Sequence, residues 1–301
     1  MKNLNTDWAF AQYERVRSIL PAASFPDRWS KINKIEEIAD QVDVFLLDAF
    51  GVLNVGRTVI PGAPEWVSSL QKRGKKVLVV ANGSSVSPEA SLLRFKNMGF
   101  DFAMEDVIAS RNVLGRTLKG RKQKLWGVML ASNGGIEQIP VDSIRLGENR
   151  DDFDRVEGFI LFGTGEWSEK QQELLLASLM EKSRPVLVGN PDIVAPRENG
   201  FSLEPGWFAH EIYERCGISP EFFGKPFPNI YEHALERVGA EIDRQRIVMV
   251  GDTLHTDVWG GAAIGAKTVL MADYGLFAGL DVVPYIEKSG IVPNWIATAK
   301  C

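Results

Sequence analysis

The chain has little cysteine and little histidine. Of its 301 residues, two are cysteine (Cys216 and Cys301) and three are histidine. The cysteines lie far apart and form no Cys-x-x-Cys motif, so the sequence offers neither a disulfide framework nor a zinc site. A chain without disulfides suits a reducing compartment, and we expect a cytoplasmic protein.

The sequence also lacks long apolar runs and an excess of positive charge. No stretch approaches the roughly 20 apolar residues that span a bilayer, and residues 1–20 lack the apolar core of a signal peptide. The net charge of −5 argues against a broad surface for nucleic acid or for an anionic membrane. A small-molecule partner is compatible with this balance, because one basic pocket for a phosphate would hardly change it.

Short apolar runs alternate with helix-like segments along the chain. The runs that we interpret as buried strands are Val44–Leu47, Val77–Val80, Leu125–Leu130, Phe159–Phe162, Val186–Val188, Ile247–Val250 and Thr268–Met271. The helix-like segments are Ala63–Lys72, Pro88–Met98, Ser168–Lys182, Pro228–Val238 and Thr256–Ile264. Such alternation is typical of an α/β protein with a doubly wound, largely parallel sheet. At this length we expect two compact units.

Polar clusters follow several of the predicted strands. Four of them are centred on Asp48, Asn82, Lys225 and the pair Asp252 and Asp257. Ligand sites of open parallel sheets lie beyond the carboxyl ends of the strands. We therefore expect these clusters to converge on one crevice.

The residue types in these clusters suit phosphate chemistry. A carboxylate at a strand end, such as Asp48, can attack phosphorus and form an aspartyl-phosphate. Asp252 and Asp257 could share a hard cation with it, because Mg²⁺ takes a few protein oxygens and completes its shell with water and phosphate. Lys225 is a point charge suited to a phosphoryl oxygen. Each residue alone could equally be a helix cap or a solvated side chain, so the prediction depends on their order and shared position.

That order carries a specific resemblance. Along the chain come Asp48-x-x-Gly-Val-Leu, Asn82-Gly-Ser, Gly-Lys225-Pro-x-Pro-x-x-Tyr and Gly-Asp252-x-x-x-Thr-Asp257-x-x-x-Gly-x-x-x-Gly. This series resembles the motifs of the haloacid dehalogenase (HAD) superfamily. Its last two members resemble the class IIA branch, the NagD-like and p-nitrophenyl- or pyridoxal-phosphatase-like proteins. The similarity spans roughly residues 45–275.

The resemblance implies a Mg²⁺-dependent phosphatase acting on a small phosphomonoester, such as a sugar phosphate, through an aspartyl-phosphate. Asp48 would be the nucleophile. Mg²⁺ would be bound by the carboxylates of Asp48 and Asp252 and by the main-chain carbonyl of Phe50. Asp257 would support the metal or its water.

The phosphoryl group would be held by a second set of residues. By the same resemblance these are Lys225 and the segment Asn82, Gly83 and Ser84. Metal and lysine together would neutralise the charge on the equatorial oxygens of the transition state.

Two positions depart from the family pattern. Phosphatases of this superfamily usually carry a second aspartate two residues after the nucleophile, and here that residue is Phe50, which cannot transfer a proton. General acid–base help typically contributes about 10²–10⁴-fold, so turnover is slow or another group, such as His255 or Glu65, substitutes. The second motif usually ends its strand with Ser or Thr, and here Ala81 stands there, with Ser84 and Ser85 further along.

These departures keep two other functions open. One is a weakly active or non-catalytic relative that still binds phosphate. The other is a metal-free 2-haloacid dehalogenase, since Asp48-Ala49-Phe50-Gly51 also resembles the motif of those enzymes. The pair Asp252 and Asp257 favours a metal, and so a phosphatase.

About 140 residues separate the second motif from the third, far more than an ordinary connection. We expect a core from 1–107 and 219–301, and an inserted α/β cap over 108–218 that selects the substrate. Asn190-Pro191-Asp192 resembles a substrate-contacting loop of class IIA caps, although simple turn chemistry explains it equally well. Relatives often pair through their caps, so the resemblance also implies a homodimer.

Overall fold

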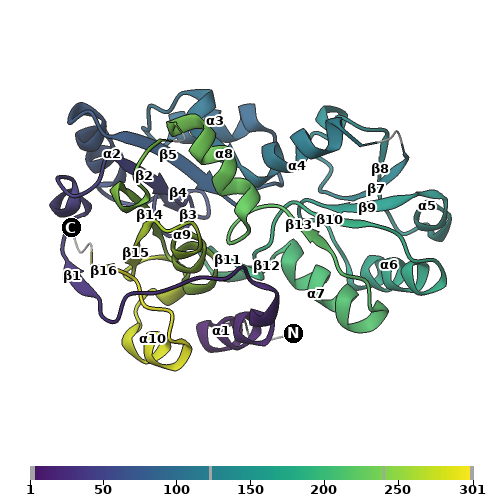
Figure 1. Cartoon of the computed structure of the whole chain (residues 1–301). Coiled ribbons are helices and arrows are strands. Elements are labelled where there is room, and N and C mark those ends of the chain that lie inside the picture. The colour runs from purple at the N-terminus through teal and green to yellow at the C-terminus, as the bar shows by residue number, and fades with distance from the viewer. Residues whose placement is uncertain (1–3, 122–123, 240, 299–301) are drawn as a thin grey trace.

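The computed structural model describes residues 4–121, 124–239 and 241–298, and within these ranges it contains two parallel sheets (Figure 1). The larger sheet has the strand order β1-β16-β15-β14-β2-β5-β6, with every neighbouring pair parallel. Its strands are β1 (Ser30–Ile32), β2 (Val44–Leu47), β5 (Lys76–Ala81), β6 (Val107–Ala109), β14 (Ile247–Gly251), β15 (Lys267–Met271) and β16 (Trp295–Ala297). The predicted doubly wound parallel sheet is confirmed.

The smaller sheet is formed by the segment between β6 and the third motif. Its order is β13-β10-β9-β7-β8, again with parallel neighbours. Its strands are β7 (Trp126–Met129), β8 (Ser143–Arg145), β9 (Gly158–Leu161), β10 (Val186–Val188) and β13 (Glu221–Phe222). Two antiparallel hairpins complete the strands of the described residues: β3 (Asn54–Val55) with β4 (Thr58–Val59), and β11 (Val194–Arg197) with β12 (Gly200–Leu203).

The sheets divide the chain slightly differently from the predicted domains. Ile108 and Ala109, which the prediction assigned to the cap, pair with β5 of the larger sheet. Glu221 and Phe222, which it assigned to the core, pair with β10 of the smaller sheet. The predicted boundary at 107/108 therefore runs through β6, and the predicted boundary at 218/219 lies just before β13. The division into core and cap domains itself stays a prediction.

Helices cover both sheets. They are α1 (Thr6–Arg15), α2 (Ala63–Lys72), α3 (Pro88–Asn97), α4 (Ser110–Lys119), α5 (Arg150–Arg155), α6 (Glu169–Glu181), α7 (Pro205–Cys216), α8 (Pro228–Val238), α9 (Trp259–Ala263) and α10 (Val283–Ser289). Where a single helix was expected over Thr256–Ile264, a π-helical turn, Leu254–Val258, leads into α9. Among the described residues no helix combines the length and apolarity needed to cross a bilayer.

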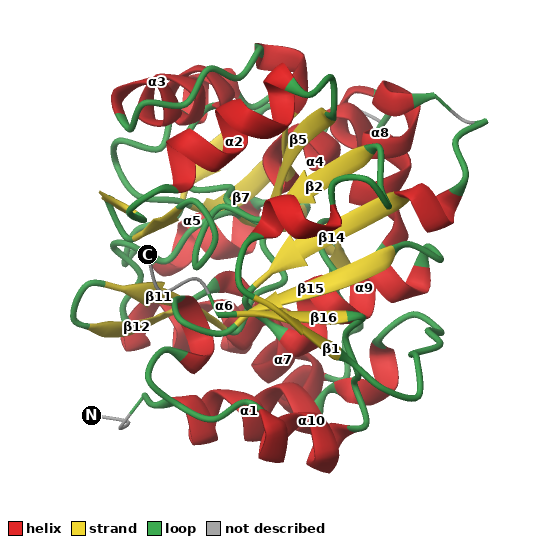
Figure 2. Cartoon of the chain, turned by 90° about the vertical axis from the view of Figure 1, so that its left-hand side faces the viewer, coloured by secondary structure: helices red, strands yellow, loops and turns green. Residues whose placement is uncertain are grey.

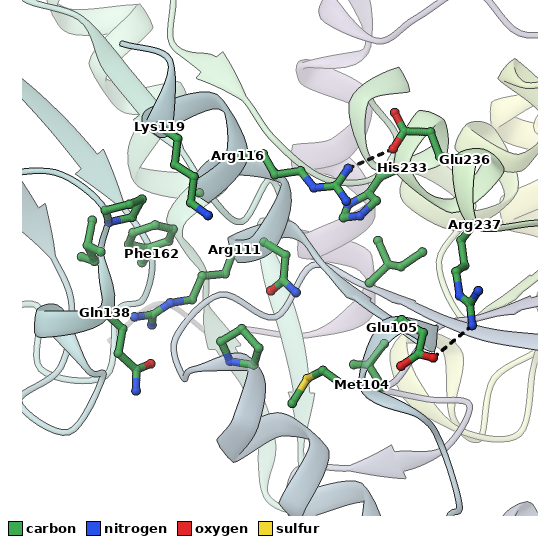
Figure 3. Close-up of a pocket in the computed structure, with 17 residues that line it drawn as sticks. Met104, Glu105, Arg111, Arg116, Lys119, Gln138, Phe162, His233, Glu236 and Arg237 are labelled. Atoms are coloured by element: carbon green, nitrogen blue, oxygen red, sulfur yellow. Dashed lines mark hydrogen bonds and ion pairs between the residues drawn. The ribbon is translucent and has the colours of Figure 1, made fainter. Parts of the chain in front are cut away.

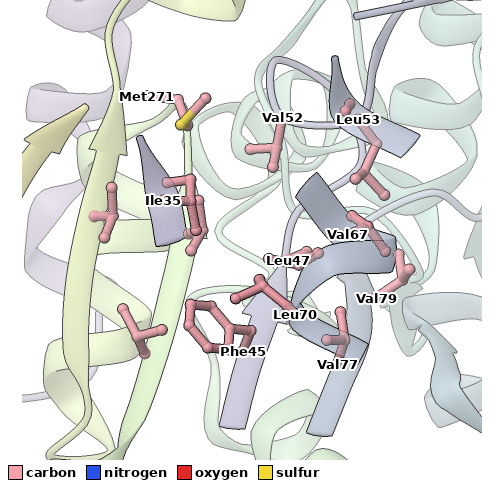
Figure 4. Close-up of a cluster of buried hydrophobic side chains, with 14 of the residues drawn as sticks. Ile35, Phe45, Leu47, Val52, Leu53, Val67, Leu70, Val77, Val79 and Met271 are labelled. Carbon is pink, nitrogen blue, oxygen red and sulfur yellow. The ribbon is translucent and has the colours of Figure 1, made fainter. Parts of the chain in front are cut away.

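Alternation along the central strands sorts their side chains onto two apolar layers. Phe45 and Leu47 of β2 pack in one buried cluster with Val67 and Leu70 of α2 (Figure 4). Val44 and Leu46 point the other way, into a cluster that contains residues of α4 and α8. Strand residues buried on both faces are expected in a parallel sheet covered by helices on both sides. Burial of each such side chain stabilises the fold by about 1.5–3 kcal/mol.

One apolar cluster also connects the two sheets. Leu114 of α4 packs in the same buried cluster as Trp126 of β7 and Phe162, which directly follows β9. Helix α4 thus lies between the sheets, and Figure 1 shows it at their junction. The smaller sheet is therefore held against the larger one by apolar packing.

The N-terminal segment packs against the larger sheet. Phe10 and Tyr13 of α1 are buried in one cluster with Leu254 of the π-helical turn. Figure 2 shows α1 beside α10, and the hydroxyl of Tyr285 in α10 donates to Asp7 at 2.6 Å. We call the parts of the chain that carry the larger and the smaller sheet the larger and the smaller unit. The segment also reaches the smaller unit, because the Tyr13 hydroxyl accepts the backbone N–H of Ile193 at 3.1 Å.

Candidate active site

The register of the larger sheet brings the motif aspartates together. In β2, Leu47 lies opposite Val250 of β14, so Asp48 and Asp252 leave adjacent strands at the same edge. Asp48 extends this pairing by donating its N–H to the Val250 carbonyl at 2.9 Å. One carboxylate oxygen from each of Asp48, Asp252 and Asp257 lies within 4.8 Å of the others. The convergence that the sequence predicted is present.

Two glycines let the backbone close around Asp252. Gly51 and Gly275 have φ of +77° and +78°, a left-handed conformation that residues with a Cβ rarely adopt. A Cβ at Gly51 would lie 2.5 Å from the Cβ of Asp252, and one at Gly275 would lie 2.6 Å from that same atom. The N–H of Leu276 donates to Oδ2 of Asp252 at 2.7 Å. Its carboxylate is therefore fixed in position by the chain around it.

Lys225 bridges two of the aspartates. Its Nζ lies 2.6 Å from Oδ1 of Asp48 and 2.7 Å from Oδ1 of Asp257. The side chains of Lys225 and Asp257 are each 1% exposed, and Asp257 also accepts the N–H of Thr253 at 3.1 Å. Buried charges persist when they are paired and hydrogen-bonded, as these are.

The site carries more carboxylate charge than Lys225 neutralises. Burial, opposed by Lys225 and reinforced by Asp257, raises the pKa of Asp48 to about 7. Burial and then the charges of Asp257 and Asp48 raise the pKa of Asp252 well above its ordinary value. Burial acts to lower the pKa of Lys225, but the surrounding carboxylates outweigh it and the pKa is raised. A second cation would relieve this repulsion.

The donor set fits a magnesium ion. Mg²⁺ takes oxygen ligands at 2.0–2.1 Å, so ligands on opposite sides of the ion are about 4.2 Å apart. Neighbouring ligands are only about 2.9 Å apart, so the three carboxylate oxygens, which lie within 4.8 Å of one another, would have to draw together around an ion. Asp257 is already engaged by Lys225 and Thr253, which suits it to a supporting position. The carbonyl of Phe50, which the resemblance implies as a further ligand, stays a prediction.

Asn82 connects the two units at the site. Its side-chain oxygen accepts the N–H of Lys225 at 2.7 Å, and its Nδ2 donates to the Lys225 carbonyl at 2.9 Å and to Oδ1 of Asp192 at 2.8 Å. The sequence predicted that Asn82 would hold the phosphoryl group. Its amide instead fixes the backbone of Lys225, the residue whose ammonium group faces Asp48.

The rest of the second motif is also held from within the protein. The hydroxyl of Ser84 donates to the carbonyl of Phe162. Nη1 of Arg111 donates to the carbonyl of Ser84 at 3.3 Å. The Ser84 hydroxyl, predicted to bind phosphate, thus bonds to the chain that follows β9. Gly83, Ser84 and Ser85 nevertheless line the small cavity beside Asp48.

The predicted cap loop reaches the same cavity. Asn190 and Asp192 both line it. The side-chain oxygen of Asn190 accepts the N–H of Asp192 at 2.9 Å, and its Nδ2 donates to Glu204 at 3.1 Å. Burial raises the pKa of Asp192 to about 7. The loop therefore combines the turn chemistry and the position near the site that were left as alternatives.

Phe50 lies in this cavity, where the family pattern has an aspartate. The cavity has a volume of about 80 Å³ and is lined by residues of both units, among them Asp48 and Asp252. The guanidinium carbons of Arg94 and Arg197 lie 5.6 Å and 5.0 Å from the centre of the Phe50 ring. A phenyl ring and two guanidinium groups thus surround the place of the absent proton donor.

The two groups named as substitutes for that donor lie elsewhere. Nε2 of His255 pairs with Glu14 at 2.6 Å, and its ring stacks on Tyr13. Glu65 is exposed in the first turn of α2. Neither residue lines the cavity that contains Asp48. In the described structure neither residue is placed to replace the carboxylate that an aspartate at position 50 would supply.

A larger cavity, of about 680 Å³, lies between α4, α8 and the segment before β8 (Figure 3). Its lining includes the basic residues Arg111, Arg116, Lys119 and Arg237, and Arg116 and Arg237 pair with Glu236 and Glu105. It shares no lining residue with the cavity at Asp48. We therefore place the active site at the smaller cavity, where the carboxylates converge.

The sequence did not single out Arg94, Arg197 or Glu204. Arg94 lies on α3, whereas Arg197 and Glu204 come from the hairpin β11–β12 and its end. None of them belongs to a motif or follows a strand of the larger sheet. Their position depends on how the hairpin lies over the site, which local sequence does not reveal.

Comparison with known proteins finds related hydrolases. Residues 45–139 match a family model described as haloacid dehalogenase-like hydrolase, and residues 222–284 match one described as HAD-hydrolase-like. An acid sugar phosphatase of Staphylococcus aureus (strain MRSA252) is 26% identical over 256 residues, covering 85% of this chain and 94% of that protein.

Two solved structures share the fold. A possible sugar phosphatase of the HAD superfamily from Cytophaga hutchinsonii has a TM-score of 0.79 at 22% identity, covering 90% of this chain and 98% of the other. A p-nitrophenyl phosphatase from Archaeoglobus fulgidus has a TM-score of 0.71 at 23% identity, covering 86% and 97%. With the ordered motifs, the converging aspartates and the inserted parallel sheet, these matches show that the chain belongs to the haloacid dehalogenase superfamily of hydrolases, in its class IIA branch.

Proposed function

We propose that this protein is a Mg²⁺-dependent phosphatase that hydrolyses a small phosphomonoester through an aspartyl-phosphate on Asp48. The observation that carries the proposal is the convergence of Asp48, Asp252 and Asp257 around the buried ammonium group of Lys225. The relatives named as sugar and p-nitrophenyl phosphatases support the reaction class.

Each residue has a defined task in this mechanism. An oxygen of Asp48 attacks phosphorus, the bond from phosphorus to the ester oxygen breaks, and the departing alkoxide takes a proton from water, which leaves hydroxide. Water then attacks the aspartyl-phosphate, restoring Asp48 and releasing inorganic phosphate and a proton that neutralises this hydroxide. Lys225, with its carbonyl and N–H fixed by Asn82, neutralises charge on the phosphoryl oxygens.

Asp48 and Asp252 would hold the magnesium ion together with the Phe50 carbonyl. When bound, the ion supplies positive charge to the phosphoryl group and lowers repulsion between it and Asp48. Gly51 and Gly275 preserve the position of Asp252 for this purpose.

Asp48→Asn tests the proposal. The variant retains the shape of the side chain and loses the nucleophile, so we expect phosphatase activity to fall by at least about 10³-fold while the fold, measured by circular dichroism, is retained. The assay measures the release of phosphate from p-nitrophenyl phosphate. It contains about 5 mM Mg²⁺, because a site of a few carboxylates binds this ion weakly. Undiminished activity in the variant would refute the assignment.

A second candidate is a phosphate-binding relative with little or no turnover. The position of Phe50 in the cavity favours it, because no proton-transferring side chain stands in its place. A panel of phosphate esters, assayed with and without Mg²⁺, separates the two functions. Binding without phosphate release would support the second. Activity on 2-chloropropionate that survives EDTA would instead support a dehalogenase.

We also propose a cytoplasmic homodimer that pairs through the smaller unit. The support is analogy with class IIA relatives and a chain without a disulfide framework. Light scattering of the purified protein would test the oligomeric state, and a monomer at micromolar concentration would exclude the dimer.

A further inference from the structure

Two arginines from different units lie near the same aromatic ring at the active site. Arg94 lies on α3 of the larger unit, and Arg197 ends β11 of the hairpin that covers it. Their guanidinium carbons lie 5.6 Å and 5.0 Å from the centre of the Phe50 ring. Both arginines line the cavity that contains Asp48.

The positive charge at this place is only partly neutralised. Arg197 pairs with Glu204 at 2.8 Å and donates to the hydroxyl of Ser202 at 2.8 Å. Arg94 has no ion pair among the described residues, and its buried Nε lacks a hydrogen-bond partner there. A buried polar group without a partner is costly, and such groups are frequently completed by a ligand.

The location of the two arginines defines which part of a substrate they would meet. Phe50 is two residues beyond Asp48, so its ring lies next to the phosphoryl pocket. A phosphoryl group between Asp48 and Lys225 would direct its ester oxygen and the attached alcohol into the remaining cavity. The leaving group of the substrate would therefore lie against Phe50, Arg94 and Arg197, which line this cavity.

We propose that Arg94 and Arg197 bind a second anionic group on the leaving group of the substrate, a carboxylate or a second phosphate. This inference rests on the proposed phosphatase function and names its substrate class. Guanidinium groups match both anions in geometry and form charge-assisted hydrogen bonds with them. The neutral phenyl ring of Phe50, which lies near both guanidinium groups, adds no competing carboxylate, whereas the aspartate usual at this position would.

The size of the cavity sets the size of the substrate. One water-sized probe occupies about 10–15 Å³, so a cavity of about 80 Å³ has room for a phosphoryl group and few other atoms. We therefore expect a leaving group of two or three carbons that ends in the second anion.

Three two-carbon esters test the inference on the full-length protein with Mg²⁺. They are 2-phosphoglycolate, with a carboxylate, ethane-1,2-diyl bisphosphate, with a second phosphate, and 2-hydroxyethyl phosphate, which is neutral at that end. A charge-assisted hydrogen bond corresponds to about a 10- to 100-fold preference, so kcat/KM should be higher by this factor for at least one anionic ester. The better of the two anionic esters identifies the group. Equal or higher kcat/KM for the neutral ester would overturn the inference.

Variants assign the preference to the two arginines. In Arg94→Gln and Arg197→Gln the ratio of kcat/KM between the preferred anionic ester and the neutral one should fall about tenfold, mainly through KM for the anionic ester. Lys96→Gln is the matched control, because it removes the same charge from an exposed position two residues along in α3. If the arginines serve only to pack against Phe50, the ratio stays that of the wild type, and the inference fails.

A binding measurement separates this inference from the proposed function. If the wild type hydrolyses none of the three esters, the phosphatase proposal fails, and the esters are titrated calorimetrically into Asp48→Asn with Mg²⁺. Tighter binding of an anionic ester, lost in Asp48→Asn combined with Arg94→Gln, would still support the anion site. Equal affinity for all three esters, or no binding, would overturn it.

Discussion

At the scale of single residues, the site differs from its superfamily pattern most clearly at Phe50. An aspartate there usually transfers the proton to the leaving group and from the attacking water. The ring of Phe50 lies under Arg94 and Arg197 instead. A leaving group that departs without a proton should suffer least from this replacement, so activity should depend steeply on the acidity of the leaving alcohol.

Phe50→Asp should restore proton transfer. We expect kcat for an alkyl phosphate to rise about 10²-fold, the lower end of the usual range for general acid–base catalysis, because the two arginines would keep the pKa of the new carboxyl low. p-Nitrophenyl phosphate, whose leaving group needs no proton, should change far less. Steady-state kinetics of both esters provide the measurement.

Phe50→Asn is the control for this gain. It has the size of aspartate but cannot transfer a proton. Equal gains in the two variants would mean that removal of the ring, and not the carboxyl group, is responsible.

At the scale of elements, segments with a strong apolar pattern could be predicted from sequence, and several short strands at or near the sheet edges could not. β2, α2 and α8 occupy the predicted ranges, because their apolar pattern decides between strand and helix, and the short strand β10 was found because all three of its residues are apolar. β1, β6, β8, β13 and β16 have two or three residues each. Such segments carry too little pattern to be recognised, and they form because a neighbouring strand edge is available to pair with.

The candidate site divides in the same way. Asp48, Asp252 and Lys225 could be predicted because each follows a strand or lies in an ordered motif. Arg94 and Arg197 could not, since they meet only when the hairpin β11–β12 is placed over the larger sheet. The hydrogen bonds of Asn82 and Ser84 to other parts of the chain likewise depend on contacts with distant segments.

The loop after β15 makes an element-scale prediction. Gly275→Ala should weaken Mg²⁺ affinity by about 10- to 100-fold, the usual effect of disturbing a group that orients a ligand, because its Cβ would collide with Asp252. Gly279→Ala is the matched control: Gly279 has nearly the same φ, +79°, and a Cβ there meets no atom within 4 Å.

Both variants should lose about 1–2 kcal/mol of stability through backbone strain. Calorimetric titration with Mg²⁺ should separate them. Equal Mg²⁺ affinity in the two variants would show that the loop does not position the carboxylate of Asp252.

At the scale of the whole molecule, both units contribute residues to one cavity. An apolar cluster joins α4 to the smaller sheet, and Asn82 ties Lys225 to Asp192 across the cavity. The cavity is lined from both units. Under the proposed function, the arginines that would meet the leaving group are distinct from Asp48, so we expect that substrate choice can change without disturbance of Asp48.

Global stability should depend on His210 in mildly acidic solution. Burial and then Arg15 lower the pKa of this histidine to about 4, whereas the unfolded value is about 6.5. The contribution of His210 to the free energy of unfolding is complete above pH 6.5, where the histidine is neutral in both the folded and the unfolded protein. It is lost as the pH falls toward 4, because the unfolded chain takes up the proton first.

The expected loss between pH 6.5 and pH 4 is about 2–3 kcal/mol. Urea unfolding of wild type and His210→Leu at several pH values isolates this contribution, since other titrating groups are common to both proteins. A difference in unfolding free energy that does not change between pH 7 and pH 4 would contradict the assignment.

The proposed arrangement of Asp48, Asp252 and Lys225 around one cation and one phosphoryl group can be tested directly. A crystal structure with Mg²⁺ and beryllium trifluoride, which mimics a phosphoryl group on aspartate, is the measurement. We expect the beryllium on an oxygen of Asp48, Mg²⁺ on the carboxylates of Asp48 and Asp252, and Nζ of Lys225 within hydrogen-bond distance of a fluorine. An unmodified Asp48, or a cation bound away from these two carboxylates, would contradict the account.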